Sequence, residues 1–126
     1  MNENKITVLL VEDDSFLLGM YATKFEIENF NVITAEDGEK GLKAAKEKNP
    51  DIILLDILMP RMNGVEVLEE LKKDDSTKNI PVILLTNLNQ REEIERCMSM
   101  GADDYLIKAH FMPSEVIEKV KNILSK

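Results

Sequence analysis

The stretch that most constrains the fold runs from Ile52 to Asp56, where four aliphatic residues end in a carboxylate. A short apolar run with β-branched residues is typical of a strand that is buried on both faces of a sheet. Pro60 and Gly64 follow, and because proline removes a ladder donor and glycine marks a turn, the strand should stop near Asp56. The sequence therefore predicts a carboxylate at the carboxyl end of a central strand, where open α/β sheets bind ligands. The alternative is a turn or capping role for this residue.

Apolar runs and helical patterns alternate along the rest of the chain, separated by turn signals such as Asp37-Gly38 and Asn49-Pro50. Five strands that alternate with five helices predict a doubly wound α/β fold, with a parallel sheet between two layers of helices. The first, third and fourth strands are the most apolar and are placed centrally, which predicts the order 2-1-3-4-5. The predicted strands are 6–11, 31–34, 52–56, 81–86 and 105–108, and the predicted helices are 15–28, 38–48, 64–73, 90–100 and 113–124.

Length and composition predict a single domain over 1–126, because 126 residues with 44% hydrophobic residues suffice for one core. The formal net charge of -8 argues against nucleic-acid binding, since phosphate backbones would be repelled. The apolar runs are too short to span a membrane and the first residues do not resemble a signal sequence, so we expect a cytoplasmic protein without membrane association. Cys97 is the single cysteine, which excludes an internal disulfide, and it is expected to pack within a helix.

A second acidic cluster follows the first predicted strand. With right-handed crossovers the first and third strands become neighbours, so Glu12 or Asp13 is expected to approach Asp56. Crowded carboxylates repel one another unless a cation lies among them, and oxygen ligands without His or Cys suit Mg²⁺. The alternative is an acidic loop in which Asp14 or Ser15 caps the next helix, and for Asp14 we favour it. The same carboxylates argue against the phosphate cradle of a flavodoxin or a P-loop enzyme.

Two other polar side chains, Thr86 and Lys108, end predicted strands at the same edge of the sheet. A hydroxyl donor and an ammonium are what a transferred phosphoryl group needs opposite a metal, because its equatorial oxygens carry the charge. Each residue alone is weak evidence, since a strand often ends in a threonine or a solvated lysine. The conjunction of both with Asp13 and Asp56 is much more specific.

Together these motifs resemble the receiver domain of two-component response regulators, over essentially the whole chain. The resemblance implies the CheY-like form of the flavodoxin-like fold. No effector domain is visible in the sequence, so we expect a single receiver domain, either a stand-alone regulator or one cut from a longer protein. It also implies that the protein is not an enzyme, apart from self-phosphorylation from a phosphodonor and slow autodephosphorylation. The resemblance rests on Val11-Glu12-Asp13-Asp14, Asp56 with Met59-Pro60 and Gly64, Leu85-Thr86, and the run from Gly101 to Lys108.

The resemblance further implies a metal-dependent phosphoacceptor site. Asp56 would be phosphorylated, and Mg²⁺ (or Mn²⁺) would be bound by Asp13, by Asp56 and by the backbone carbonyl of Leu58. Glu12 would act through a metal-bound water.

The remaining site residues would contact the phosphoryl group and transmit the signal. Thr86 would hydrogen-bond to the group and Lys108 would pair with it, and Tyr105 would turn inward as a switch. The alternative for Tyr105 is a static, half-buried core aromatic.

The implied partners are a sensor histidine kinase or phosphotransfer protein and a downstream protein target that the sequence does not identify. The surface of the fourth helix, fifth strand and fifth helix would change on phosphorylation, in a monomer or a phosphorylation-dependent dimer. The first predicted helix carries more apolar residues than one buried stripe needs. Either its buried face is wide, or one or two of Phe16, Leu18 and Met20 stay exposed and dock on a kinase.

Three features depart from the family pattern. Ala109 stands where a proline usually follows Lys108, and we predict that a cis peptide is retained there to aim the ammonium, although it costs about 3 kcal/mol. Asn87 replaces a very small residue and would restrict access of water and small donors. Leu58 and Leu88 are apolar where polar residues are common, which predicts slow hydrolysis of the aspartyl phosphate.

Two other function classes compete with this interpretation. An aspartate-nucleophile phosphohydrolase typically has a second Asp two residues after the nucleophile, but Leu58 occupies that position, so turnover should be poor. A phosphorylation-independent binding module would be favoured if acidic or lysine positions were missing, and all of them are present. His110 is expected to be a loop residue and not a relay phosphosite.

Overall fold

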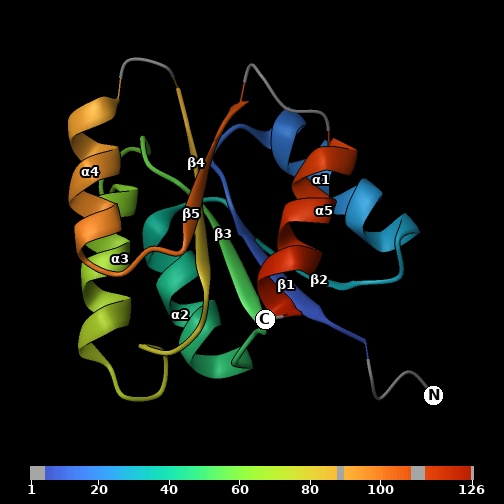
Figure 1. Ribbon diagram of the computed structural model, residues 1–126, viewed down its shortest axis with the longest axis horizontal. Coiled ribbons are helices and arrows are strands. Elements are labelled where there is room, and N and C mark those ends of the chain that lie inside the picture. The colour runs from blue at the N-terminus through green and yellow to red at the C-terminus, as the bar shows by residue number, and fades with distance from the viewer. Residues whose placement is uncertain (1–4, 88–89, 109–112, 126) are drawn as a thin grey trace.

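The computed structural model describes residues 5–87, 90–108 and 113–125, and its sheet lies between two layers of helices (Figure 1). Five parallel strands follow the predicted order, β2-β1-β3-β4-β5. The strands are β1 (Thr7–Val11), β2 (Asn31–Ala35), β3 (Ile52–Asp56), β4 (Val82–Thr86) and β5 (Asp104–Ile107). The helices are α1 (Ser15–Ile27), α2 (Gly38–Lys48), α3 (Gly64–Lys73), α4 (Arg91–Ser99) and α5 (Pro113–Leu124).

The ten predicted elements are all present, and their ends differ from the predicted ones by one residue at most. One of these differences concerns the candidate site. The sequence pattern places Lys108 at the end of the fifth strand, but β5 ends at Ile107. The reason is the length of the neighbouring strand: Thr86 is the last residue of β4 and pairs with Ile107, so the next residue has no ladder partner.

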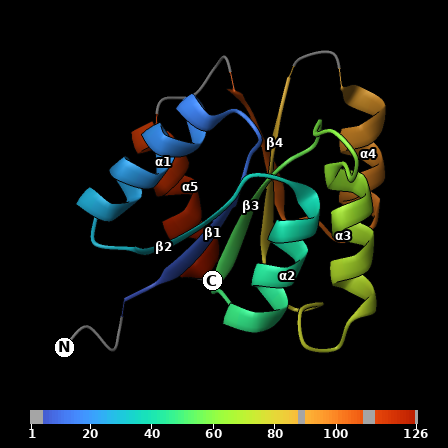
Figure 2. The ribbon, with the colours of Figure 1, turned by 180° about the vertical axis from the view of Figure 1, so that it is seen from behind.

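Each central strand contributes alternate residues to two hydrophobic clusters, because successive side chains point to opposite faces of the sheet. Helices α1 and α5 cover one face, and α2, α3 and α4 cover the other (Figures 1 and 2). The face under α1 and α5 takes Val8, Leu10, Ile52, Leu54, Ile83 and Leu85. The face under α2, α3 and α4 takes Leu9, Val11, Ile53, Leu55, Val82 and Leu84.

The edges and helices agree with the burial expected from sequence. β2 is an edge strand with exposed and half-buried positions, whereas every residue of β3 and β4 is buried. Cys97 is fully buried in α4, where burial raises the pKa of its thiol to about 11, so it is a packing residue. None of the helices in the described segments combines the length and the apolar character needed to cross a bilayer.

Candidate functional site

The position of Asp56 is fixed by the turn that follows β3. Its side chain is 3% exposed, and the next residue, Ile57, donates its N–H to the carbonyl of Leu85. The chain then returns past the strand end, where the N–H of Gly64 donates to the carbonyl of Ile57 at 2.7 Å. A Cβ atom on Gly64 would lie 2.4 Å from the backbone oxygen of Asp56, so only glycine fits this close approach. The carboxylate is therefore held at the carboxyl end of a central strand.

Three carboxylates meet at this edge of the sheet, as the sequence predicts. Glu12, Asp13 and Asp56 each offer an oxygen within 4.8 Å of the others. Glu12 is buried, and its Oε2 atom has no hydrogen-bond partner in the described part of the chain, whereas Asp13 is exposed. An oxygen-only donor set with an unpartnered buried carboxylate oxygen fits a hard divalent cation such as Mg²⁺. The cluster is thus able to bind a metal.

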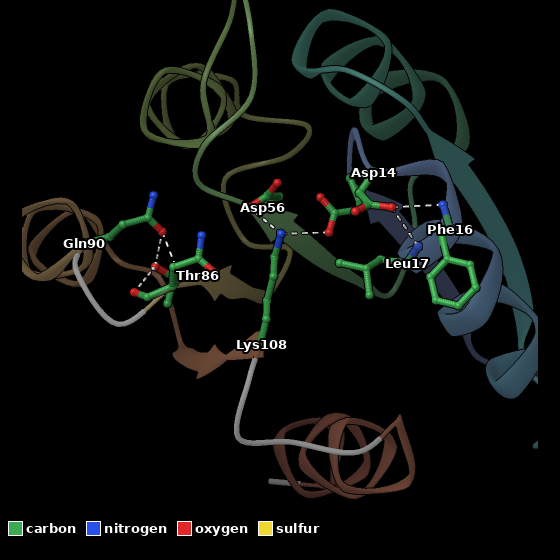
Figure 3. Close-up of polar contacts among 9 residues, drawn as sticks. Asp14, Phe16, Leu17, Asp56, Thr86, Gln90 and Lys108 are labelled. Atoms are coloured by element: carbon green, nitrogen blue, oxygen red, sulfur yellow. Dashed lines mark hydrogen bonds and ion pairs between the residues drawn. The ribbon is translucent and has the colours of Figure 1, made fainter.

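Asp14 has a different role from its acidic neighbours. It is the N-cap of α1, and its Oδ1 atom accepts hydrogen bonds from the backbone N–H groups of Phe16 at 3.0 Å and Leu17 at 3.1 Å (Figure 3). These bonds satisfy two of the donors that a helix start leaves open. The capping alternative is therefore confirmed for Asp14, while Ser15 is the first residue of the helix.

Lys108 brings a positive charge into the carboxylate cluster. Its Nζ atom lies 2.8 Å from Glu12 Oε1 and 3.1 Å from Asp56 Oδ1, and its side chain is largely buried. Burial and the neighbouring Glu12 raise the pKa of Asp56 to about 8, although Lys108 acts in the opposite direction. Burial lowers the pKa of Lys108, but its bonds to the two carboxylates outweigh burial and raise it. One ammonium does not balance three carboxylates, so the cluster still favours a cation.

Thr86 lies at the same edge of the sheet as Asp56, but its hydroxyl donates to a residue that no sequence motif indicates. The Thr86 Oγ1 atom lies 2.5 Å from Oε1 of Gln90, and 3.2 Å from the backbone oxygen of Asn87. The alternation along β4 puts Thr86 on the face covered by α4, and Gln90 directly precedes that helix. Glutamine is not a typical capping residue, so no sequence pattern indicates this contact.

Tyr105 faces outward in this structure. Its ring is 40% exposed beside a cavity of about 500 Å³ between α4 and β5. The inward turn of Tyr105 stays a prediction. The residues that line the cavity are Arg91, Ile94, Glu95, Met98, Tyr105 and Ile107.

Two parts of α1 behave differently. Phe16 is 77% exposed and Met20 is also exposed, whereas Leu18 is buried in the core. The first two border a shallow apolar groove of about 620 Å³ that extends along α1 to Ile27. The expectation that one or two of these three residues stay exposed is therefore met by Phe16 and Met20, while Leu18 lies on the core-facing side of the helix. Docking of the exposed pair on a kinase stays a prediction.

The structure describes only some of the residues that depart from the family pattern. Leu58 is 56% exposed and Asn87 is exposed as well, so both side chains border the solvent near the site. Leu88, Ala109 and His110 lie outside the described residues. The predicted cis peptide after Lys108 and the loop role of His110 are therefore untested, and so is the effect of Leu58 and Leu88 on hydrolysis.

Comparison with known families and proteins gives a consistent result. A statistical model of the response regulator receiver domain matches residues 8–121. The alkaline phosphatase synthesis transcriptional regulatory protein PhoP of Bacillus subtilis is 34% identical over 119 residues, which cover 94% of this chain and 48% of that protein. The chain spans about half the length of the curated relatives it matches.

Solved structures with the same fold include two receiver domains. A CheY-like response regulator receiver domain protein from Methanospirillum hungatei matches with a TM-score of 0.90 and 28% identity, over 97% of this chain and 95% of that one. The receiver domain of the Francisella response regulator 1452 matches with a TM-score of 0.84 and 35% identity, over 95% of this chain and 96% of that one. The likeness thus extends over nearly the whole chain on both sides.

Proposed function

The chain belongs to the response regulator receiver domain family of two-component signalling, and we propose that it accepts a phosphoryl group on Asp56. The donor would be a sensor histidine kinase or a phosphotransfer protein. The observation that supports this most is the environment of Asp56, a buried carboxylate beside Glu12 and Asp13 and paired with the ammonium of Lys108. This arrangement offers a nucleophile, a cation site and a fixed positive charge within one small volume.

The chemistry follows from the positions of these side chains. An Asp56 carboxylate oxygen would attack the phosphorus atom of a donor phosphohistidine whose other ring nitrogen carries a proton. The phosphorus–nitrogen bond would break with its electron pair on the nitrogen, so the ring leaves as neutral imidazole. Mg²⁺ held directly by Asp13, Asp56 and the Leu58 carbonyl, with Glu12 acting through a water, would supply positive charge beside the phosphoryl oxygens. Lys108 already lies 3.1 Å from Asp56 and would pair with the same oxygens.

Thr86 and Tyr105 would carry the signal outward. A new phosphoryl group adds charge and acceptor oxygens, which would attract the Thr86 hydroxyl. Both Thr86 and Tyr105 lie on the side of the sheet that α4 covers, and in the proposed switch movement of the first would vacate space for the second. The surface of α4, β5 and α5 would then differ between the two states and control a downstream protein.

The downstream protein that this surface would control is proposed only as a class. The relatives named above include a transcriptional regulatory protein twice the length of this chain, so an attached or separate output protein would receive the signal. Nucleic-acid binding by this domain itself is not proposed, because its formal net charge is -8.

The test is incubation with Mg²⁺ and acetyl phosphate, followed by intact-mass measurement. We expect one added phosphoryl group on the wild type, and none on Asp56→Asn or in the absence of a divalent metal. Asp75→Asn is the matched control, because Asp75 is an exposed carboxylate that pairs with Lys78 before the start of β4 and should leave the adduct unchanged.

Two results would contradict the proposal. Release of inorganic phosphate without an adduct would indicate a phosphohydrolase. A chain that neither gains a phosphoryl group from acetyl phosphate nor from any histidine kinase or phosphotransfer donor would be a phosphorylation-independent binding module.

A further inference from the structure

Gln90 holds the end of β4 through its side-chain amide. The side chain is 3% exposed, and its Oε1 atom lies 2.5 Å from Thr86 Oγ1 and 2.8 Å from the backbone nitrogen of Asn87 (Figure 3). The backbone nitrogen of Gln90 in turn donates to the carbonyl of Asn87 at 3.3 Å. One side chain thus links the end of β4, at the candidate site, to the start of α4.

The hydrogen bonds determine which way the amide faces. The N–H of Asn87 is a donor only, so the atom that receives it must be the amide oxygen of Gln90. The other end of the amide, Nε2, is buried and has no hydrogen-bond partner among the residues that the structure describes. The conformation is therefore maintained by the two bonds to Oε1.

The Thr86 hydroxyl has one proton, which limits its hydrogen bonds. A carboxamide oxygen accepts only, so the hydroxyl donates to Gln90 in this state. A phosphoryl oxygen is also an acceptor only. The hydroxyl can therefore donate to Gln90 or to a phosphoryl group on Asp56, but not to both at once.

We propose that Gln90 is a positioning residue that keeps the Thr86 hydroxyl bonded away from Asp56 in the unphosphorylated protein. The inference rests on the proposed function, in which the hydroxyl turns to the phosphoryl group. Phosphorylation then breaks the Thr86–Gln90 bond and leaves the amide oxygen of Gln90 held by the N–H of Asn87 alone. Binding of a phosphoryl group and loss of the Thr86–Gln90 bond are coupled, so this bond opposes activation.

Gln90 is well placed to pass the loss of this bond on to α4. Gln90 directly precedes α4, and the first turn of that helix supplies Arg91 and Ile94 to the cavity beside Tyr105. A shift of Gln90 would therefore move α4 residues that line this cavity. An inward turn of Tyr105 would take its ring out of the same cavity. The bond thus links the site to the outer surface through a single side chain.

The test is the affinity for beryllofluoride, a phosphoryl analogue, in the presence of Mg²⁺. Gln90→Met keeps the length of the side chain but lacks the amide acceptor, and should bind about fivefold more tightly, the factor expected for one net hydrogen bond. Gln90→Ala is the second variant should the first fold poorly. In a Thr86→Ala background neither substitution should change the affinity, because there is no hydroxyl left to hold.

A matched control separates this coupling from a general loss of packing. Thr77 is also buried, and its hydroxyl donates to the carbonyl of Leu71 at 2.7 Å, away from the site. In a Thr77→Ala background, Gln90→Met should still tighten binding about fivefold. An unchanged affinity in the wild-type background, or the same change with and without the Thr86 hydroxyl, would overturn the proposal.

A second measurement needs no ligand and separates this inference from the proposed function. The Thr86 hydroxyl proton of the free protein should be protected from exchange and detectable by NMR next to the Gln90 side chain, and it should be lost in Gln90→Met. A wild-type protein that fails to bind beryllofluoride with Mg²⁺ but shows this proton would refute the proposed function and leave the bond in place. A rapidly exchanging Thr86 hydroxyl would refute the role of Gln90.

Discussion

The ammonium of Lys108 lies closer to Glu12 Oε1, at 2.8 Å, than to Asp56 Oδ1, at 3.1 Å. Glu12 is the more deeply buried carboxylate of the two, and it keeps one oxygen without a hydrogen-bond partner within the described segments. The lysine therefore neutralises a structural charge as well as facing the candidate phosphoacceptor. Removing it should affect folding even where no phosphoryl group is present.

Lys108→Met is expected to lower the free energy of unfolding of the metal-free protein by about 3 kcal/mol, because two buried carboxylates lose the ammonium that pairs with both of them. Urea denaturation in the presence of a chelator measures this change. Lys119→Met is the control, since Lys119 pairs with Asp104 in a partly exposed bridge and should cost less than about 1 kcal/mol. Equal losses in the two variants would contradict the buried character of the Lys108 pairs.

The raised pKa of Asp56 predicts a pH-dependent effect of Asp56→Asn on stability. The carboxyl has a pKa of about 8 in the folded protein, against 3.8 ordinarily, so the folded state binds more protons between these values. Wild-type stability should therefore fall as the pH rises from about 4 to 8, and Asp56→Asn should lack this component. At pH 8 without metal the variant should melt higher than the wild type, and below pH 4 the gain should vanish.

Thermal melts across this pH range, with a chelator present, check the sign. Asp75→Asn provides the matched comparison, because it removes an exposed carboxylate and should leave the pH profile unchanged. A gain for Asp56→Asn that stays constant from pH 4 to 8 would show that Asp56 has an ordinary pKa in the folded protein.

The adjacent residues Asp13 and Asp14 should differ sharply in metal binding. Asp13 offers an oxygen to the acidic cluster, whereas Asp14 accepts bonds from the first turn of α1. Asp13→Asn should weaken Mg²⁺ affinity by about tenfold or more, because a charged ligand is lost. Asp14→Asn should change it little, and asparagine keeps the cap. Calorimetric titration with Mg²⁺ measures both, and a similar loss in the two variants would exclude Asp13 as the specific ligand.

Two glycines should respond in opposite directions to the same substitution. A Cβ atom on Gly64 would lie 2.4 Å from the backbone oxygen of Asp56 and 2.7 Å from Ile57 Cα. Gly64→Ala should therefore destabilise the fold by about 2 kcal/mol and displace the Asp56 carboxylate. Gly19 lies inside α1, where a Cβ atom would meet nothing within 4 Å. Gly19→Ala should stabilise the protein by about 1 kcal/mol, because alanine favours the helix. Chemical denaturation compares the two, and a destabilising Gly19→Ala would refute the open space at that position.

The fold and the strand-end residues were accessible from sequence because they follow from periodicity. The run that ends in Asp56 has the pattern of a strand buried on both faces, and right-handed crossovers then bring Asp13 to it. Side-chain partners were not accessible in the same way. Nothing in the spacing of Thr86 and Gln90 predicts that their side chains meet, since this depends on rotamers and on where α4 begins. The burial of Leu18 between exposed neighbours likewise depends on how α1 is rotated over the sheet.

The alternation of side chains along β3 also restricts how relatives of this chain can vary in length. Leu54 and Leu55 face different hydrophobic clusters, and Asp56 pairs with Leu85 at the end of the ladder. An inserted or deleted residue within β3 would move each aliphatic side chain to the wrong layer and turn the carboxylate to the opposite face. Insertions and deletions should therefore be confined to segments at the other end of the strands, such as residues 74–80, where the chain can lengthen without moving the acceptor.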